Sequence, residues 1–135
     1  MDTDRMRTSA LAALALLLAG CAVLRAGEGS RLTIAGSVTQ FECAALPADS
    51  VAVVELRERG VVEAPVLAEV RVPLRAGQVP VPFELQVDRA ALKSGRRHAV
   101  RAAIVAPGVG SWAGEPVDVD PRGTRVELGT LQVAR

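Results

Sequence analysis

The regular alternation of apolar and polar residues is the feature that most constrains the fold of this chain. From residue 31 onward, apolar side chains recur at every second position, as at Leu32, Ile34 and Val38, with mostly polar residues between them. A period of two is typical of a β-strand with one face buried and the other in solvent. Comparable stretches follow at residues 50–59, 66–75, 79–87, 97–105, 111–119 and 124–133. The pattern therefore predicts about seven strands.

Turn-forming residues separate these stretches, as at residues 46–49, 76–78, 107–110 and 120–123, and only residues 88–94 have helical character. Short strands at regular spacing with almost no helix are typical of a sandwich. The prediction is an all-β fold: a single immunoglobulin-like antiparallel β-sandwich over residues 31–135. In the last stretch Val126 and Leu128 have opposite parity to Leu131 and Val133, so we expect a β-bulge at Gly129.

The stretch at residues 79–87 is predicted to begin at the edge of a sheet. Val79 and Val81 share an apolar face, whereas Pro80 and Pro82 cannot donate a hydrogen bond to a neighbouring strand. This edge, with Val79 and Val81, and the strand at residues 31–39 are candidate sites for pairing with a partner strand. The alternative is that the prolines serve to prevent such pairing.

An apolar run at residues 10–19 follows a charged start with Arg5 and Arg7. It is shorter than the roughly 20 residues that span a bilayer, and it has no polar face. A charged start before an apolar core of about 7–15 residues is typical of a secretory signal peptide. We therefore expect residues 1–20 to be removed.

The run ends in Leu18, Ala19, Gly20 and Cys21, which fits a bacterial lipobox. The thiol of Cys21 would receive a diacylglycerol and the new amino terminus a further acyl chain, such as palmitate. Each buried methylene adds about 0.8 kcal/mol, so two or three chains anchor a protein firmly. Residues 21–30 would form the lipidated N-terminus and a flexible tether. The alternative is a plain secreted protein with a free Cys21.

Charge and cysteine content exclude several classes of function. The net charge is +1, with no basic run and no aromatic platform, so we expect no nucleic-acid partner. With Cys21 acylated, Cys43 is either a small buried residue or a thiol that pairs with another chain. Two cysteines and the single His98 cannot build a zinc site. No metal or cofactor is predicted.

Three features are candidate sites. His98 has no nucleophile pattern to pair with, so we expect a structural role for it and no enzymatic activity. Trp112 lies in a glycine-rich stretch and is either an exposed anchor for a protein or glycan, or a cap on the open end of the core. An acidic cluster could in principle bind calcium, but we expect a solvated strand face. Its members are Glu115, Asp118 and Asp120.

Several segments together resemble a known family. They are Leu46-Pro47-Ala48-Asp49-Ser50, Gln78-Val79-Pro80-Val81-Pro82-Phe83-Glu84, Asp88-Arg89-Ala90-Ala91-Leu92 and His98-Ala99-Val100-Arg101-Ala102. Behind a lipobox, this series is similar to the YbaY family of lipoproteins, which is grouped with the YscW-type lipoprotein chaperones of type III secretion. The resemblance covers residues 32–119. The family usually has a tyrosine where this chain has His98.

The resemblance implies a lipoprotein of the outer membrane that faces the periplasm, because Ala22 follows the anchor as in outer-membrane lipoproteins. YscW-like members are pilotins, which help to bring a secretin ring to the outer membrane. The first hypothesis is therefore a non-enzymatic module that binds a protein partner in the cell envelope, such as a secretin. The alternative is an envelope module that binds a glycan or small ligand.

Overall fold

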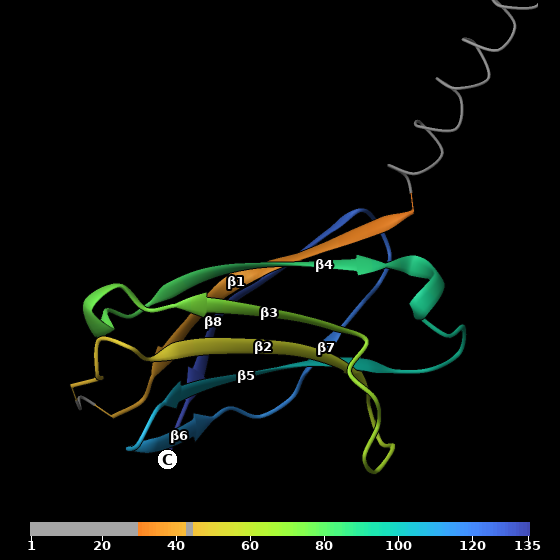
Figure 1. Ribbon diagram of the computed structural model, residues 1–135. Coiled ribbons are helices and arrows are strands. Elements are labelled where there is room, and N and C mark those ends of the chain that lie inside the picture. The colour runs from red at the N-terminus through yellow and green to blue at the C-terminus, as the bar shows by residue number, and fades with distance from the viewer. Residues whose placement is uncertain (1–29, 43–44) are drawn as a thin grey trace, which may run out of the picture. The chain divides into compact units, whose positions relative to one another are not determined.

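In the computed structural model, residues 30–42 and 45–135 are described (Figure 1). The expected signal peptide, the lipobox with Cys21, most of the tether and Cys43 lie outside the described residues, and the expectations for them stay predictions. Residues 32–135 form a compact unit, and every core residue found in the described part of the chain lies in it.

The described residues form eight β-strands and two short 3₁₀ helices. The strands are β1 (Arg31–Gln40), β2 (Val51–Glu58), β3 (Ala68–Pro73), β4 (Val81–Asp88), β5 (His98–Ala106), β6 (Gly110–Ala113), β7 (Val117–Val119) and β8 (Arg125–Val133). The helical turns are η1 (Arg75–Gly77) and η2 (Arg89–Ala91). The side-chain carboxylate of Asp88 accepts a hydrogen bond from the N–H of Ala90 and so caps η2.

The strands form two sheets that pack into a sandwich (Figure 1). The first sheet has the order β4-β1-β8, and the second has the order β3-β2-β5-β6, with β7 also pairing with β5. The predicted all-β sandwich is confirmed. One of the expected strands is divided into β6 and β7, between which Gly114 and Pro116 interrupt the pattern.

One pairing differs from the expected antiparallel arrangement, because β1 and β8 run parallel. They lie near opposite ends of the chain, and no hairpin joins them, so chain connectivity does not impose an antiparallel direction. The alternating pattern requires one buried face and is the same for either direction. The expectation of antiparallel pairing throughout is therefore wrong at this one position.

The β1–β8 register also contains the expected bulge. Ala35 pairs with Glu127 but Ser37 pairs with Thr130, so β8 has one more residue than β1 in this interval. Gly129 lies there with φ of 71°, a conformation that glycine adopts most easily. Gly36 lies opposite, where a Cβ atom would be 2.6 Å from the carbonyl oxygen of Gly129.

The core consists of the inward-facing residues of both sheets. Leu32, Ile34 and Val38 of β1 are fully buried, as are Ala52, Val54 and Leu56 of β2. Val81, Phe83, Leu85 and Val87 of β4 alternate with exposed residues, as their period predicts.

The two ends of the sandwich hold different loops (Figure 1). We call the end at which β1 begins the Leu32 end. It also holds the end of β2, the start of β5 and the end of β7, since Glu58 pairs with His98 and His98 pairs with Val119. The opposite end holds η1 and the β5–β6 turn.

Candidate partner-binding surface

The two sheets are bonded together along one side of the sandwich. Ala113, at the end of β6, and Ala134, after β8, each donate a backbone N–H to the other's carbonyl oxygen, at 2.9 and 3.1 Å. The guanidinium of Arg135 lies over the Trp112 ring, 5.5 Å from its centroid, and also donates to the carbonyl of Val109 at 3.0 Å. These contacts close the sandwich on the β6–β8 side.

The opposite side is bordered by β3 and β4, each the last strand of its sheet (Figure 1). The N–H of Leu74 donates to the carbonyl of Ser50 at 2.9 Å. Because hydrogen-bonded pairs alternate along an antiparallel ladder, Val72 and Val70 also bond toward β2. The N–H groups of Glu69 and Arg71 therefore point away from β2, toward the open edge.

A groove of about 420 Å³ lies where the end of β3 approaches the start of β4. We call the region from β3 across this groove to β4 the β3–β4 seam. The groove is lined by Val72, Pro73, Arg75, Gln78, Pro80, Val81 and Pro82. Most of these side chains are apolar, and Val70, Val72 and Val79 pack against the core while being only partly covered. Apolar surface of the core is thus accessible at the seam.

The segment at residues 78–84, the most specific part of the resemblance described above, contributes Gln78, Pro80, Val81 and Pro82 to this groove. The predicted edge position of β4 is confirmed. Val81 is only 8% exposed and Val79 is half-buried, so their side chains face inward. A partner would instead meet the exposed rings of Pro80 and Pro82 and the backbone.

Two expectations for this surface need correction. The strand at residues 31–39 is not available as an edge, because β1 lies between β4 and β8. The β3 edge, which the sequence did not single out, carries outward N–H groups. Its alternation resembles that of every other strand, so no local signal distinguished it.

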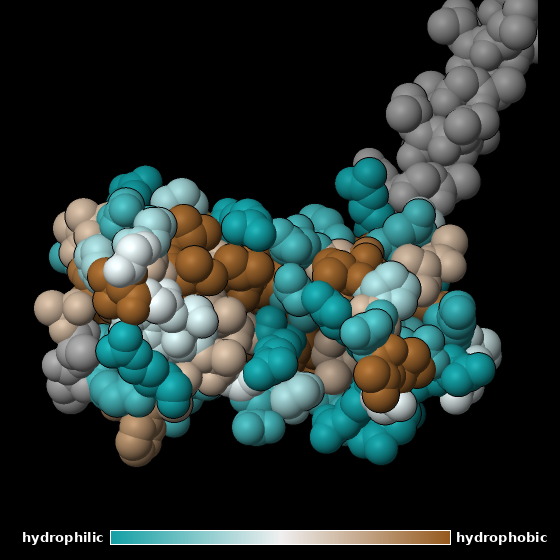
Figure 2. Space-filling view, turned by 60° about the horizontal axis from the view of Figure 1, so that its bottom comes forward, coloured by the Kyte–Doolittle hydropathy of each residue, from teal (hydrophilic) through white to brown (hydrophobic). Residues whose placement is uncertain are grey.

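Trp112 does not serve as an exposed anchor. Its side chain is 3% exposed and belongs to the hydrophobic core. The alternative expectation, that Trp112 caps the core, agrees with its position beneath Arg135. On the face shown in Figure 2, hydrophobic residues form separate brown areas among teal hydrophilic ones.

His98, the first residue of β5, is buried with 4% of its surface exposed. Its Nε2 atom is fully enclosed and has no hydrogen-bond partner among the described residues.

Among the residues of the predicted acidic cluster, Asp118 and Asp120 each pair with arginine side chains. The Asp118 carboxylate accepts hydrogen bonds from Arg59 at 2.6 Å and Arg97 at 2.7 Å.

Arg97 and Arg59 lower the pKa of Asp118 below its ordinary value, because their hydrogen bonds and charges favour the carboxylate. Arg122 lowers the pKa of Asp120 in the same way.

The residues described contain no group of three or more His, Cys, Asp or Glu side chains placed to hold a metal ion. In the same part of the chain, no helix is long and apolar enough to cross a membrane.

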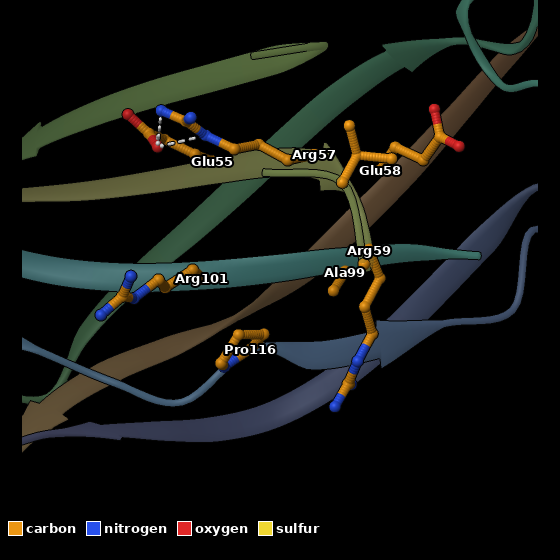
Figure 3. A pocket seen from close by; sticks show the side chains of 9 residues that line it. Glu55, Arg57, Glu58, Arg59, Ala99, Arg101 and Pro116 are labelled. Atoms are coloured by element: carbon orange, nitrogen blue, oxygen red, sulfur yellow. Dashed lines mark hydrogen bonds and ion pairs between the residues drawn. The ribbon is translucent and has the colours of Figure 1, made fainter. Parts of the chain in front are cut away.

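The outer face of the second sheet has a further cavity, of about 350 Å³ (Figure 3). Arg57 turns toward Glu55, with which it forms an ion pair at 3.0 Å, and Arg59 and Arg101 extend on either side of Pro116 (Figure 3). Positive and negative groups are mixed on this face. Five of the nine residues that line this cavity are charged, whereas one of the seven that line the β3–β4 groove is charged.

A sandwich that is bonded along one side and presents apolar surface along the other is suited to holding another polypeptide. The chain belongs to the type III secretion system lipoprotein chaperone family (YscW), which matches residues 30–127. The predicted family is confirmed, and with it a protein-binding role of the chaperone or pilotin type. No finding supports the alternative of glycan binding.

A similar solved structure is an alternative pilotin from the type II secretion system of Vibrio cholerae, which is 28% identical. The alignment covers 78% of this chain and 98% of the pilotin, with a TM-score of 0.64. A 9R-lipoxygenase from Cyanothece PCC8801 also matches, at 15% identity over 78% of this chain and 17% of the enzyme, but its TM-score of 0.48 supports no conclusion. A search of the curated proteins gave no match.

Proposed function

We propose that this protein is a pilotin-type chaperone that is acylated at Cys21, faces the periplasm from the outer membrane, and binds a secretin subunit at the β3–β4 seam. The family description and the pilotin of known structure support this class of partner. The observation that carries the proposal is the partly covered apolar groove between β3 and β4.

The seam offers two complementary kinds of contact. The prolines at positions 73, 80 and 82 present exposed apolar rings. The N–H groups of Glu69 and Arg71 offer hydrogen bonds to an extended segment. A partner segment with apolar residues on one face would cover the groove and pair with the β3 edge. Binding in this way needs no acid, base or nucleophile, which agrees with a non-enzymatic role.

The acylated protein should retain a co-expressed secretin subunit on affinity purification. In Pro82→Asp, a charge placed in the groove should lower the retained subunit by about 10-fold or more, because the bound state would desolvate an unpaired carboxylate. Val105→Asp is the matched control, since Val105 is 40% exposed on the outer face of the second sheet. Equal loss in both variants would contradict binding at the seam.

The anchor is tested separately by Cys21→Ser. This variant should lack the acyl mass in intact-protein mass spectrometry and should not fractionate with the outer membrane. The same acyl mass on wild type and variant would refute the lipobox. Because capture by purified protein does not require a membrane, a failed anchor and a failed seam give different results.

A further inference from the structure

A second cavity, at the Leu32 end of the sandwich, has a strongly positive lining. It measures about 330 Å³ and lies between the segment that joins β4 to β5 and the loop before β8. Its lining residues are Arg89, Leu92, Lys93, Ser94, Gly95, Arg96, His98, Pro121 and Arg122. Four of them are cationic and none carries a carboxylate, although the protein as a whole has a net charge of only +1.

Two of these cations have no carboxylate partner. Arg96 forms an ion pair with Glu58 at 3.1 Å, and Arg122 forms one with Asp120 at 2.6 Å. Arg89 instead donates to the backbone carbonyls of Pro121 and Gly123, which hold its guanidinium without neutralising its charge. Lys93 is exposed and forms no ion pair with any described residue.

His98 forms part of the wall of this cavity. It is buried, with 4% of its surface exposed, and its Nε2 atom is fully enclosed, so this atom does not face a ligand in the cavity. Ser94, at the same cavity, adds a hydroxyl group that can donate to an anion.

We propose that this cavity binds a phosphate group, with Lys93 and Arg89 supplying charge and Ser94 supplying a hydrogen bond. Phosphate oxygens are strong acceptors that pair well with Arg and Lys. The source of the phosphate follows from the position of the cavity. Cys21 precedes Leu32 by 11 positions, and a chain extends at most about 3.6 Å per residue.

An acyl anchor on Cys21 would therefore lie within about 40 Å of the Leu32 end. The phosphate of an anionic lipid headgroup is thus within reach of the cavity, and binding it would orient the sandwich on the membrane surface. The choice of a lipid as the source rests on the proposed acylation. Binding of phosphate itself does not.

The test uses residues 30–135, which hold both sheets and every core residue found in the described part of the chain. His98 lies in the cavity wall and is the only histidine in the chain, so its imidazole ¹⁵N resonances report on this cavity alone. Inorganic phosphate should shift these resonances in a saturable way. Lys93→Glu should weaken this binding by about 25-fold, since each unit of charge at such a site changes affinity by about 5-fold.

Arg75→Glu is the matched control, because Arg75 is exposed in η1 at the opposite end of the sandwich. It should leave phosphate binding unchanged. Absence of a saturable shift of the imidazole resonances, or equal weakening in Arg75→Glu and Lys93→Glu, would overturn the proposal.

Vesicles then distinguish the two sources of phosphate. Sedimentation with phosphatidylglycerol vesicles should exceed that with phosphatidylcholine vesicles, and the difference should disappear in Lys93→Glu. Phosphate binding without a difference between vesicles would support the site and assign it to a free phosphate. Because residues 30–135 lack Cys21, these results do not depend on whether the chain is acylated.

Discussion

Trp112 illustrates how one residue takes its role from a contact distant in sequence. Its ring is buried because the chain end folds across it, with Arg135 above the ring. The local sequence, with glycines at positions 110 and 114, fits an exposed turn equally well. Because Arg135 follows 23 positions later, no inspection of the neighbouring residues could have chosen between the two alternatives.

The substitution Trp112→Ala should therefore act on stability. Removing a buried indole from the core should lower the free energy of unfolding by about 3–5 kcal/mol, measured by urea denaturation. Val62→Ala is the control, since Val62 is 92% exposed and should change stability by less than about 0.5 kcal/mol. A stable Trp112→Ala variant would show that the ring is not part of the core.

Among the elements, the strands with the clearest alternation were the ones that could be predicted from the sequence. The parity change after Leu128 correctly located the bulge at Gly129. The prolines at positions 80 and 82 correctly indicated the edge position of β4. The parallel direction of β1 and β8 could not be predicted, because a buried face leaves the same pattern in either direction.

β7 is the shortest of the described strands, with three residues. Ion pairs help to hold it against the second sheet. Asp118 in β7 joins Arg59, just after β2, to Arg97, just before β5. The folded-state pKa of Asp118 lies below the ordinary value of 3.8. Its contribution to stability is therefore present above about pH 5 and is lost as the pH falls through 3.8 toward the folded-state pKa.

Asp118→Asn should consequently lower stability slightly at pH 6 and flatten the loss of stability between pH 6 and pH 3. Urea denaturation at several pH values measures both effects. The difference between wild type and variant should shrink in 1 M NaCl, because these side chains are exposed and salt screens them. Identical acid dependence of the two proteins would contradict a role of Asp118 in holding β7.

At the scale of the whole molecule, the important feature is the difference between the two sides of the sandwich. The period of two determines which face of each strand is buried, but the order of strands in a sheet depends on contacts between distant segments. The seam exists because β3 and β4 end their sheets on the same side. The predicted lipobox is the opposite case, a local motif whose prediction requires no knowledge of the fold.

Amide hydrogen exchange tests how the seam takes part in binding. In the free protein, the amides of Glu69 and Arg71 should exchange rapidly, because they point away from β2, whereas those of Val70 and Val72 should be protected. If a bound secretin segment pairs with the β3 edge, Glu69 and Arg71 should become protected while the outer face of the second sheet stays unchanged. Protection limited to β5 and β6 would instead locate the partner on that outer face. The pattern along β3 thus separates strand pairing from contact with the proline-lined groove alone, in which Glu69 and Arg71 would continue to exchange.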